Sequence, residues 1–353
     1  MEKFAGSSLQ ELFSAPFVIW GTGRVAQAFY RAYCEKSSGE KPLFWVDSNA
    51  AKHGKRIDGI EIAAPEVFYR ESEAAYAKGE RLSVVIGATG IFLLEILSLL
   101  ERKMVKACVY SAVQLDAACY FSGESERVAK ITQGFADEKS RHIYRSLIEN
   151  MKSGRPVDFS LYEPNQYFGN DVIGELARGG GFVDAGVCHG EEIDRAVHGG
   201  GIFVHGFEPD AENYAYLLKK YEGRQEVCIH PCALWDREER LVFESNAATP
   251  SASRLAAGEA ADAQGIAARP LDDVLQGAPC TLLKMDIEGA EYRALLGAAK
   301  TIEEHRPKLA ICVYHSLEDY VRIPELLMER YPFYRFFLRQ HSATSGETVL
   351  YAL

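Results

Sequence analysis

Carboxylates stand at the ends of two apolar runs in the second half of the chain. Asp184 lies near the end of the run that starts at Phe182, and Glu208 ends the next one. Gly186 and Gly190 follow Asp184, and glycine permits both a tight turn and the close approach of a ligand to the backbone. Because parallel strands end at the same edge of a sheet, acids and glycines in these positions predict a nucleotide-binding crevice.

The charge of Asp184 indicates which nucleotide this crevice would accept. A carboxylate on the first turn repels the pyrophosphate of a dinucleotide, which is usually held by a glycine-rich turn and a helix N-terminus. S-adenosylmethionine has no phosphate and carries an ammonium and a sulfonium, which a carboxylate attracts. Glu208 would then accept hydrogen bonds from the ribose hydroxyls. The pattern is weak by itself, and a structural turn with Asp184 as a helix cap is the alternative.

A third group of acids follows the apolar segment at 282–285. The run Lys284-Met-Asp-Ile-Glu-Gly-Ala-Glu291 places Asp286 and Glu288 after a strand and Glu291 in the helix that follows. We expect this strand to lie beside the one that carries Asp184, so that both face one crevice. Three acids there can provide a base, an anchor for a substrate or a metal site, whereas helix capping is the structural alternative.

Alternating strand and helix patterns predict how these acids are positioned. The expected strands are Gly181–Ala185, Ile202–Glu208, Glu226–Leu234, Thr281–Ile287, Lys308–Tyr314, Tyr334–Arg339 and Thr348–Ala352. The last two are close enough in sequence for a hairpin, so the final strand should run antiparallel. This predicts an α/β fold with a seven-stranded, Rossmann-like sheet of the class I methyltransferase type. A long polar loop is expected at Asn246–Arg269.

A second glycine motif lies near the start of the chain. Gly21, Gly23 and Ala26 form a GxGxxA turn after an apolar strand, and Asp47 ends the next strand. This spacing is typical of a dinucleotide-binding turn and predicts a small Rossmann-like domain over residues 1–110. The segment after Asp47 resembles the small N-terminal domain of nucleotide-sugar acetyltransferases, which implies a nucleotide-sugar ligand. An NAD(P) site and a purely structural domain are the alternatives. A helical linker over 111–165 and a methyltransferase domain over 166–353 are expected to follow.

The composition excludes several classes of protein. With 47% hydrophobic and 25% charged residues, the chain has the make-up of an ordinary soluble globular protein. Its net charge of −11 and its lack of basic runs argue against a nucleic-acid partner. The start of the chain has no secretory signal pattern, and no apolar segment is long enough for a membrane span. We therefore expect a cytoplasmic protein. The helices of the linker could pack on a second subunit, so a homo-oligomer is a further expectation.

The spacing and surroundings of the cysteines predict that they are reduced thiols. None of the eight forms a CxxC pair, and several lie in apolar runs, as buried thiols of cytoplasmic proteins do. Cys228, His230 and Cys232 would share one face of a strand. No second ligand cluster with structural-zinc spacing follows them, so no metal site is predicted.

Several motifs of residues 165–353 resemble the FkbM family of methyltransferases. They are Asp184-Ala-Gly-Val-Cys-His-Gly190, Phe207-Glu-Pro209, Ala233-Leu-Trp-Asp236, Pro270-Leu-Asp-Asp273, Lys284–Glu291 and Tyr314-His315, in the family's order. The resemblance implies an S-adenosylmethionine-dependent O-methyltransferase that acts on a hydroxyl of a sugar, glycan precursor or secondary metabolite. Val187 and Cys188 stand where the family commonly has Ala and Asn.

The resemblance and the chemistry of methyl transfer together assign the expected roles. The cofactor would be bound by Asp184, Gly186, Gly190, Glu208, Ala233 and Asp286, and the acceptor by Glu288 and Glu291. Because a sulfonium is already an activated methyl donor, the protein mainly aligns the acceptor oxygen, and a base adds rate. Asp286 is the first candidate for this base and His315 the second. The rival functions are an NAD(P)-linked or nucleotide-sugar-binding enzyme that uses the N-terminal turn, and a non-catalytic binding protein.

Overall fold

The computed structural model describes residues 8–153, 162–174, 179–198, 201–244, 254–257, 265–342 and 346–353. The chain divides into two compact units. The first comprises residues 1–125 and 146–156, and the second comprises 126–145 and 157–353. None of the helices within the described ranges is long and apolar enough to cross a membrane.

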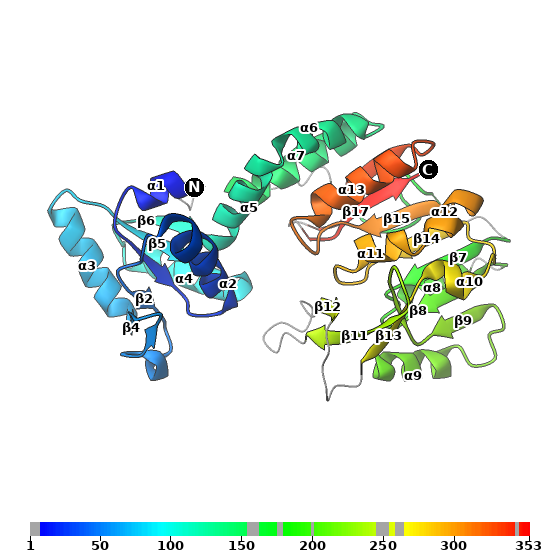
Figure 1. The fold of residues 1–353 in the computed structure, drawn as a ribbon, viewed down its shortest axis with the longest axis horizontal. Coiled ribbons are helices and arrows are strands. Elements are labelled where there is room, and N and C mark those ends of the chain that lie inside the picture. The colour runs from blue at the N-terminus through cyan, green and yellow to red at the C-terminus, as the bar shows by residue number, and fades with distance from the viewer. Residues whose placement is uncertain are drawn as a thin grey trace. The chain divides into compact units, whose positions relative to one another are not determined.

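The first unit is built on a six-stranded sheet with the order β3-β4-β2-β1-β5-β6 (Figure 1). Its strands are parallel except for the pair β3 and β4. The strands are β1 (Phe17–Trp20), β2 (Trp45–Val46), β3 (Arg56–Ile57), β4 (Ile60–Ala63), β5 (Leu82–Ile86) and β6 (Ala107–Ser111). The helices are α1 (Leu9–Phe13), α2 (Arg24–Phe29), the π-helix η1 (Tyr30–Ser38), the 3₁₀ helix η2 (Ala50–Lys52), α3 (Pro65–Ala77), α4 (Gly90–Arg102) and α5 (Ala112–Gly123).

Both faces of this first sheet are covered by helices. Successive side chains of a strand point to opposite faces, so β1 contributes to two cores. Ile19 packs with Phe29 of α2 on one face, while Trp20 packs with Phe68 of α3 and Ile96 of α4 on the other. The predicted Rossmann-like sheet of the N-terminal part is therefore confirmed.

The second unit contains the predicted seven-stranded sheet, with the order β16-β17-β15-β14-β7-β8-β9. Its strands are β7 (Gly181–Ala185), β8 (Phe203–Phe207), β9 (Val227–His230), β14 (Leu282–Met285), β15 (Lys308–Cys312), β16 (Phe336–Gln340) and β17 (Thr348–Ala352). Only β17 runs antiparallel to its neighbours, as the hairpin pattern predicted. The helices are α6 (Ser125–Gly134), α8 (Glu191–His198), α9 (Ala211–Lys220), α10 (Leu271–Leu275), α11 (Glu291–Leu296), α12 (Ala299–His305) and α13 (Asp319–Arg330), together with α7 (Glu138–Ser153), which continues into the first unit after Arg145.

The central strands of the second sheet are buried along their whole length. Every residue of β7 and β14 is buried, including the charged Asp184 and Lys284, as is typical of strands covered on both faces. On one face Phe182, Val204 and Ile229 pack against Ile193 of α8 and Leu217 of α9. This packing fixes the ends of the strands at which the predicted site residues stand.

A separate sheet corrects two predictions about the middle of this unit. Its order is β10-β13-β11-β12, with β10 (Ala233–Leu234), β11 (Glu239–Glu244), β12 (Arg254–Ala257) and β13 (Ile266–Arg269). The predicted strand Glu226–Leu234 is wrong as one element, because β9 ends at His230 and β10 belongs to the other sheet. Pro231 has no N–H to donate to a ladder and separates the two. The loop predicted over 246–269 is wrong where it contains β12 and β13. Residues 245–253 and 258–264 of it lie outside the described residues.

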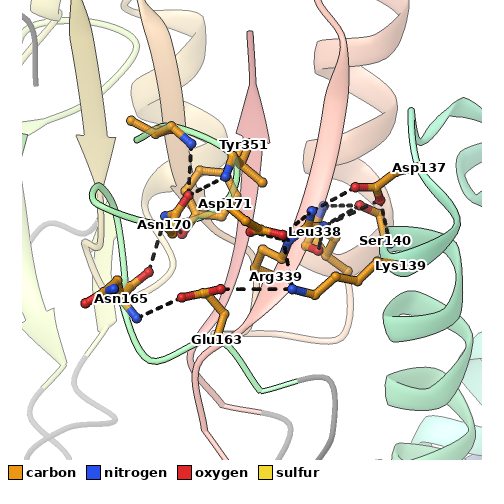
Figure 2. A network of polar contacts seen from close by, with 12 residues as sticks. Asp137, Lys139, Ser140, Glu163, Asn165, Asn170, Asp171, Leu338, Arg339 and Tyr351 are labelled. Atoms are coloured by element: carbon orange, nitrogen blue, oxygen red, sulfur yellow. Dashed lines mark hydrogen bonds and ion pairs between the residues drawn. The ribbon is translucent and has the colours of Figure 1, made fainter. Parts of the chain in front are cut away.

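A buried arginine attaches the segment before and within α7 to the second sheet (Figure 2). Arg339 of β16 places Nη2 2.7 Å from Asp137 Oδ2, Nε 2.8 Å from Asp171 Oδ1 and Nη1 2.9 Å from Ser140 Oγ. Ser140 Oγ also accepts from the backbone N–H of Leu338 at 2.9 Å. The planar guanidinium thus joins three segments that are far apart in the sequence.

Candidate active site

The predicted site residues stand at the carboxyl ends of neighbouring parallel strands. Asp184 lies in β7 and is followed by the glycine turn, whereas Glu208 and Asp286 directly follow β8 and β14. His315 comes shortly after β15. Because β15, β14, β7 and β8 are adjacent in the sheet, all four residues meet at one edge.

Asp184 is occupied inside the protein rather than presented to a ligand. The parallel register of β7 and β14 pairs it with Lys284, and Lys284 Nζ lies 2.9 Å from Asp184 Oδ1. The side chains are 0% and 3% exposed. Burial raises the pKa of Asp184 to about 6, against the opposing effect of Lys284. The ammonium of Lys284 therefore neutralises Asp184, whose negative charge was predicted to attract the sulfonium of the cofactor.

Lys284 also links this pair to the glycine turn. Its Nζ donates to the backbone oxygen of Gly186 at 2.7 Å. Burial alone would lower the pKa of Lys284, but Asp184 and Asp286 outweigh it and hold the pKa above its usual range. The lysine, which the sequence left without a definite role, is thus a permanently charged support of the turn.

Contacts with the protein require glycine at both predicted positions of the turn. Gly186 and Gly190 have φ values of +83° and +84°. A Cβ on Gly186 would lie 1.9 Å from the backbone oxygen of Asp286, and one on Gly190 would lie 2.4 Å from the hydroxyl of Tyr221. The turn thus approaches the end of β14 and helix α9 closely, which no other residue type permits.

Glu208 closes the same turn from the neighbouring strand. Its Oε2 accepts from the N–H of Cys188 at 2.8 Å, and its Oε1 accepts from the N–H of Asp210 at 2.9 Å. Burial raises the pKa of Glu208, and these two donors oppose that rise. Since each carboxylate oxygen has two lone pairs, Glu208 keeps acceptor positions that these two N–H groups do not occupy.

Ala233, the remaining predicted cofactor residue, lies in β10 of the small sheet. It is buried in a cluster with Trp235, Ala268 and Ala290. Its backbone pairs with Ala268 of β13. The structure therefore places Ala233 in a small apolar core that also contains Ile287 and Ala290 of the segment after β14.

Asp286 is the centre of a hydrogen-bonded group of side chains. Tyr167 donates to its Oδ2 at 2.7 Å, and Tyr314 donates to its Oδ1 at 3.2 Å. His315 Nε2 lies 3.3 Å from the same Oδ1. Burial alone would raise the pKa of Asp286, but His315, Lys284 and Tyr167 outweigh it and hold the pKa well below its usual range. Asp286 is therefore an ionised acceptor.

His315 lies between two carboxylates. Besides its contact with Asp286, its Nδ1 lies 3.1 Å from Glu291 Oε1. Burial alone would lower the pKa of His315, but Asp286 and Glu291 raise it to about 11. An imidazolium that keeps its proton at neutral pH cannot act as a base. The predicted role of His315 as the second candidate base is therefore not supported by its geometry.

The two acids predicted to bind the acceptor differ in exposure. Glu291 is fully buried, and its Oε1 also accepts from the backbone N–H of Ile287 at 2.7 Å. Glu288 has a half-exposed side chain 3.7 Å from His315 Nε2, and burial raises its pKa. Of the two, only Glu288 is accessible to a substrate.

The group formed by Asp286, Glu291 and His315 also has the donor set of a cation site. Single ligand atoms of Asp286, Glu291 and His315 all lie within 4.8 Å of one another. A divalent ion would have to replace the proton of His315, since the imidazolium now holds the two carboxylates together.

The sequence did not identify several residues of this cluster by role. Tyr167 lies before β7 with a φ of +64°, and Tyr314 shares its hydroxyl between Asp286 and Glu347 Oε1, 3.3 Å away. Gln166 donates to the other oxygen of Glu347 at 3.0 Å. The available signals were the aromatic pair at 167–168 and the Tyr314-His315 step, neither of which reveals a partner.

The N-terminal glycine turn is packed and its acid is paired. Gly21 has a φ of +107°, and a Cβ on Gly87 would lie 2.3 Å from that of Ala26, so the small residues serve helix–strand packing. A Cβ on Gly23 would meet no atom within 4 Å. Asp47 accepts from Thr22 Oγ1 and, at 2.9 Å, from Lys52 Nζ. Burial alone would raise the pKa of Asp47, but these donors lower it. A nucleotide contact of Asp47, as the glycine motif predicted, would compete with them.

A family model and a solved structure match the chain. The family model described as the Methyltransferase FkbM domain matches residues 184–341. The chain is similar to Methyltransferase FkbM from Methylobacillus flagellatus KT, at 21% identity and a TM-score of 0.62, covering 100% of this chain and 95% of that one. No curated protein matches the sequence.

Two further solved structures are more distant. Fibrillarin from Aeropyrum pernix, in complex with natively bound S-adenosyl-L-methionine, is 10% identical over 52% of this chain and 70% of that one, with a TM-score of 0.35. UDP-D-quinovosamine 4-dehydrogenase from Vibrio fischeri is 18% identical over 28% of this chain and 76% of that one, with a TM-score of 0.22.

The extent of the family match agrees with the geometry. It begins at Asp184 and includes Glu208, Asp286 and His315, which the sheet brings to one edge. The structural likeness to the Methylobacillus protein shows the same fold. Residues 184–341, which contain these four residues, therefore match the family model of the FkbM methyltransferase domain.

Proposed function

We propose that the second unit transfers a methyl group from S-adenosylmethionine to a hydroxyl oxygen of a sugar, glycan precursor or secondary metabolite. The observation that carries this proposal is the state of Asp286. Three donors occupy it, with Tyr314 and His315 on Oδ1 and Tyr167 on Oδ2. Since a carboxylate has about four acceptor positions, one remains on Oδ2 for an acceptor hydroxyl.

The residues around the glycine turn fit the cofactor. Glu208 would accept from the ribose hydroxyls with the lone pairs that Cys188 and Asp210 leave free. S-adenosylmethionine supplies an activated methyl group on a sulfonium. Asp184 supports the turn through its ion pair with Lys284, so its charge is not available to the cofactor.

The protein's own part in the transfer is alignment and charge. Asp286 would accept the hydrogen bond of the acceptor hydroxyl and so orient its oxygen for in-line attack. Its low pKa makes it a weak base, so it would receive the hydroxyl proton only as the oxygen becomes positively charged. His315, paired with Glu291, would keep Asp286 ionised and in place.

Calorimetry with S-adenosylhomocysteine tests the cofactor site. Glu208→Gln keeps one acceptor oxygen but loses the charge. We expect this variant to bind S-adenosylhomocysteine roughly tenfold or more weakly than the wild type, since a hydrogen bond to a charged group contributes about 1.5–3 kcal/mol. Glu226→Gln, which removes a surface carboxylate paired with Arg224, is the matched control and should bind as the wild type does. Folded wild-type protein that binds no S-adenosylhomocysteine would refute the proposal.

Turnover tests the role of Asp286. Asp286→Asn should lower methyl transfer to a panel of hydroxyl acceptors by roughly 10²-fold, the size expected when one proton-accepting group is lost. Transfer at the wild-type rate by this variant would show that Asp286 does not orient the acceptor.

A further inference from the structure

A second cluster of ligand-type side chains lies on β8 and on the edge strand β9 of the seven-stranded sheet. The parallel register of β8 and β9 places His205 opposite Cys228. His230 stands two residues beyond Cys228 on the same strand, so all three project from one face. The sequence pattern contained Cys228 and His230 together with Cys232, which lies beyond the end of β9; it did not contain His205, which comes from the neighbouring strand.

The three side chains converge on one point. His205 Nδ1 lies 3.1 Å from His230 Nε2, and one ligand atom from each of His205, Cys228 and His230 lies within 4.8 Å of the other two. A tetrahedral zinc ion needs its ligand nitrogens about 3.3 Å apart and its nitrogen and sulfur about 3.6 Å apart. The observed separation of the two nitrogens, 3.1 Å, is close to the first of these distances.

The surroundings favour neutral imidazoles and an open coordination position. Burial lowers the pKa of both histidines, and that of His230 falls to about 4 with the help of His205 and Arg269. Both imidazoles are therefore uncharged at neutral pH, which metal ligation requires. Cys228 is exposed, so water reaches the group from its side.

The chemistry of the donors selects the ion. Two imidazole nitrogens and one thiolate, without a carboxylate among them, suit zinc and similar borderline or soft divalent ions rather than magnesium or calcium. We propose that His205, Cys228 and His230 bind such a divalent cation, Zn²⁺ first among them, with water as the fourth ligand.

Binding has a defined proton balance. The two imidazoles now share one hydrogen bond between His205 Nδ1 and His230 Nε2. In the bound form each neutral ring carries its proton on the other nitrogen, and the thiol of Cys228 releases its proton to solvent. The ion then joins the edge strand β9 to β8, whose next residue, Glu208, closes the glycine turn. The site does not depend on the proposed methyl transfer.

Cobalt titration of the full, reduced and chelator-treated chain tests this site. Co²⁺ replaces Zn²⁺ and reports a sulfur ligand by a thiolate-to-cobalt charge-transfer band. We expect roughly one Co²⁺ per chain with this band, displaced by Zn²⁺. Asp286, Glu291 and His315 contain no thiol, so a cation bound there would not produce it.

Three variants separate the site from other thiols. Cys228→Ser should lose the band and weaken Co²⁺ binding by roughly tenfold or more, and His205→Gln should weaken binding likewise. Cys108→Ser, which changes a partly exposed thiol of β6 in the first unit, is the matched control and should titrate as the wild type does.

The outcomes decide the proposal. If the folded wild type binds no Co²⁺, or if the band persists in Cys228→Ser, the proposal is wrong and the two histidines are only a hydrogen-bonded pair. Should His205→Gln fail to fold, Cys228→Ser still provides the decision, because it replaces an exposed thiol by a hydroxyl of similar size.

Discussion

The proton of His315 is held from both sides. Asp286 lies at one ring nitrogen and Glu291 at the other, and the side chain of His315 is only 8% exposed. Losing this proton would leave two buried carboxylates close together without a counter-charge, which is costly. The protonated His315 therefore has a structural role: its positive charge keeps Asp286 ionised, and it does not act as a base.

This arrangement predicts a specific pH dependence of stability. The pKa of His315 rises from 6.5 to about 11 in the folded protein, so the folded state binds the proton more tightly than the unfolded state does. Protonated His315 therefore makes its full contribution to the unfolding free energy below the pKa that it has in the unfolded state. This contribution is lost as the pH rises towards the pKa that it has in the folded state. Over this interval the unfolding free energy of the wild type should fall relative to that of His315→Gln by up to about 1.4 kcal/mol per pH unit.

Urea unfolding of both proteins at a series of pH values measures this difference. His53→Gln, a change in the first unit, controls for the general effect of pH on the chain. Parallel curves for wild type and His315→Gln would mean that His315 carries no extra proton in the folded state.

At the same scale, the sequence predicted the positions of the acids but not their partners. Asp184, Glu208 and Asp286 were expected at strand ends because apolar runs and glycines are local signals. Lys284 pairs with Asp184 only because β7 and β14 are adjacent and in register, a non-local property that no single run contains. An acid that was predicted to face the cofactor is therefore part of the support beneath it.

Among the elements, long apolar strands were predictable and short mixed ones were not. All seven strands of the second sheet appear near their expected positions, and so does the antiparallel last strand. Strand β13 reads Ile-Ala-Ala-Arg and has neither alternation nor β-branched enrichment. It forms because it pairs with β10 and β11 across a long stretch of sequence, and the loop prediction failed for this reason.

The buried guanidinium of Arg339 joins elements that are far apart in the sequence, and a substitution there tests how strongly it stabilises them. Lysine keeps its charge but cannot reach Asp137, Asp171 and Ser140 at once, because it has no planar fork. We expect Arg339→Lys to lower the unfolding free energy by about 2–3 kcal/mol, which is less than the full cost of breaking a buried pair because both acids are partly exposed.

A matched change at the surface isolates this effect. Arg330→Lys alters an exposed pair with Glu303 and should cost less than about 1 kcal/mol. Urea midpoints of the two variants compare them directly. Equal midpoints would mean that the network around Arg339 is no stronger than a surface ion pair.

For the whole molecule, the central question is whether the two units unfold separately. Each has its own sheet and its own core, but α7 runs from Glu138 to Ser153 across the division between Arg145 and Ser146. Separate cores favour two transitions, and a continuous helix shared by both units favours coupling. A core variant in each unit, with and without ligand, distinguishes these cases.

We expect two calorimetric transitions. Phe68→Ala removes a fully buried ring from the first unit and should lower only one of them, whereas Leu283→Ala should lower only the other; each should cost about 3–5 kcal/mol. If the second unit holds the cofactor, S-adenosylhomocysteine should raise only the transition that Leu283→Ala lowers, because a ligand stabilises the unit that binds it. One transition that both variants and the ligand shift together would show instead that α7 couples the units, and the N-terminal sheet would then contribute to the stability of the methyltransferase part.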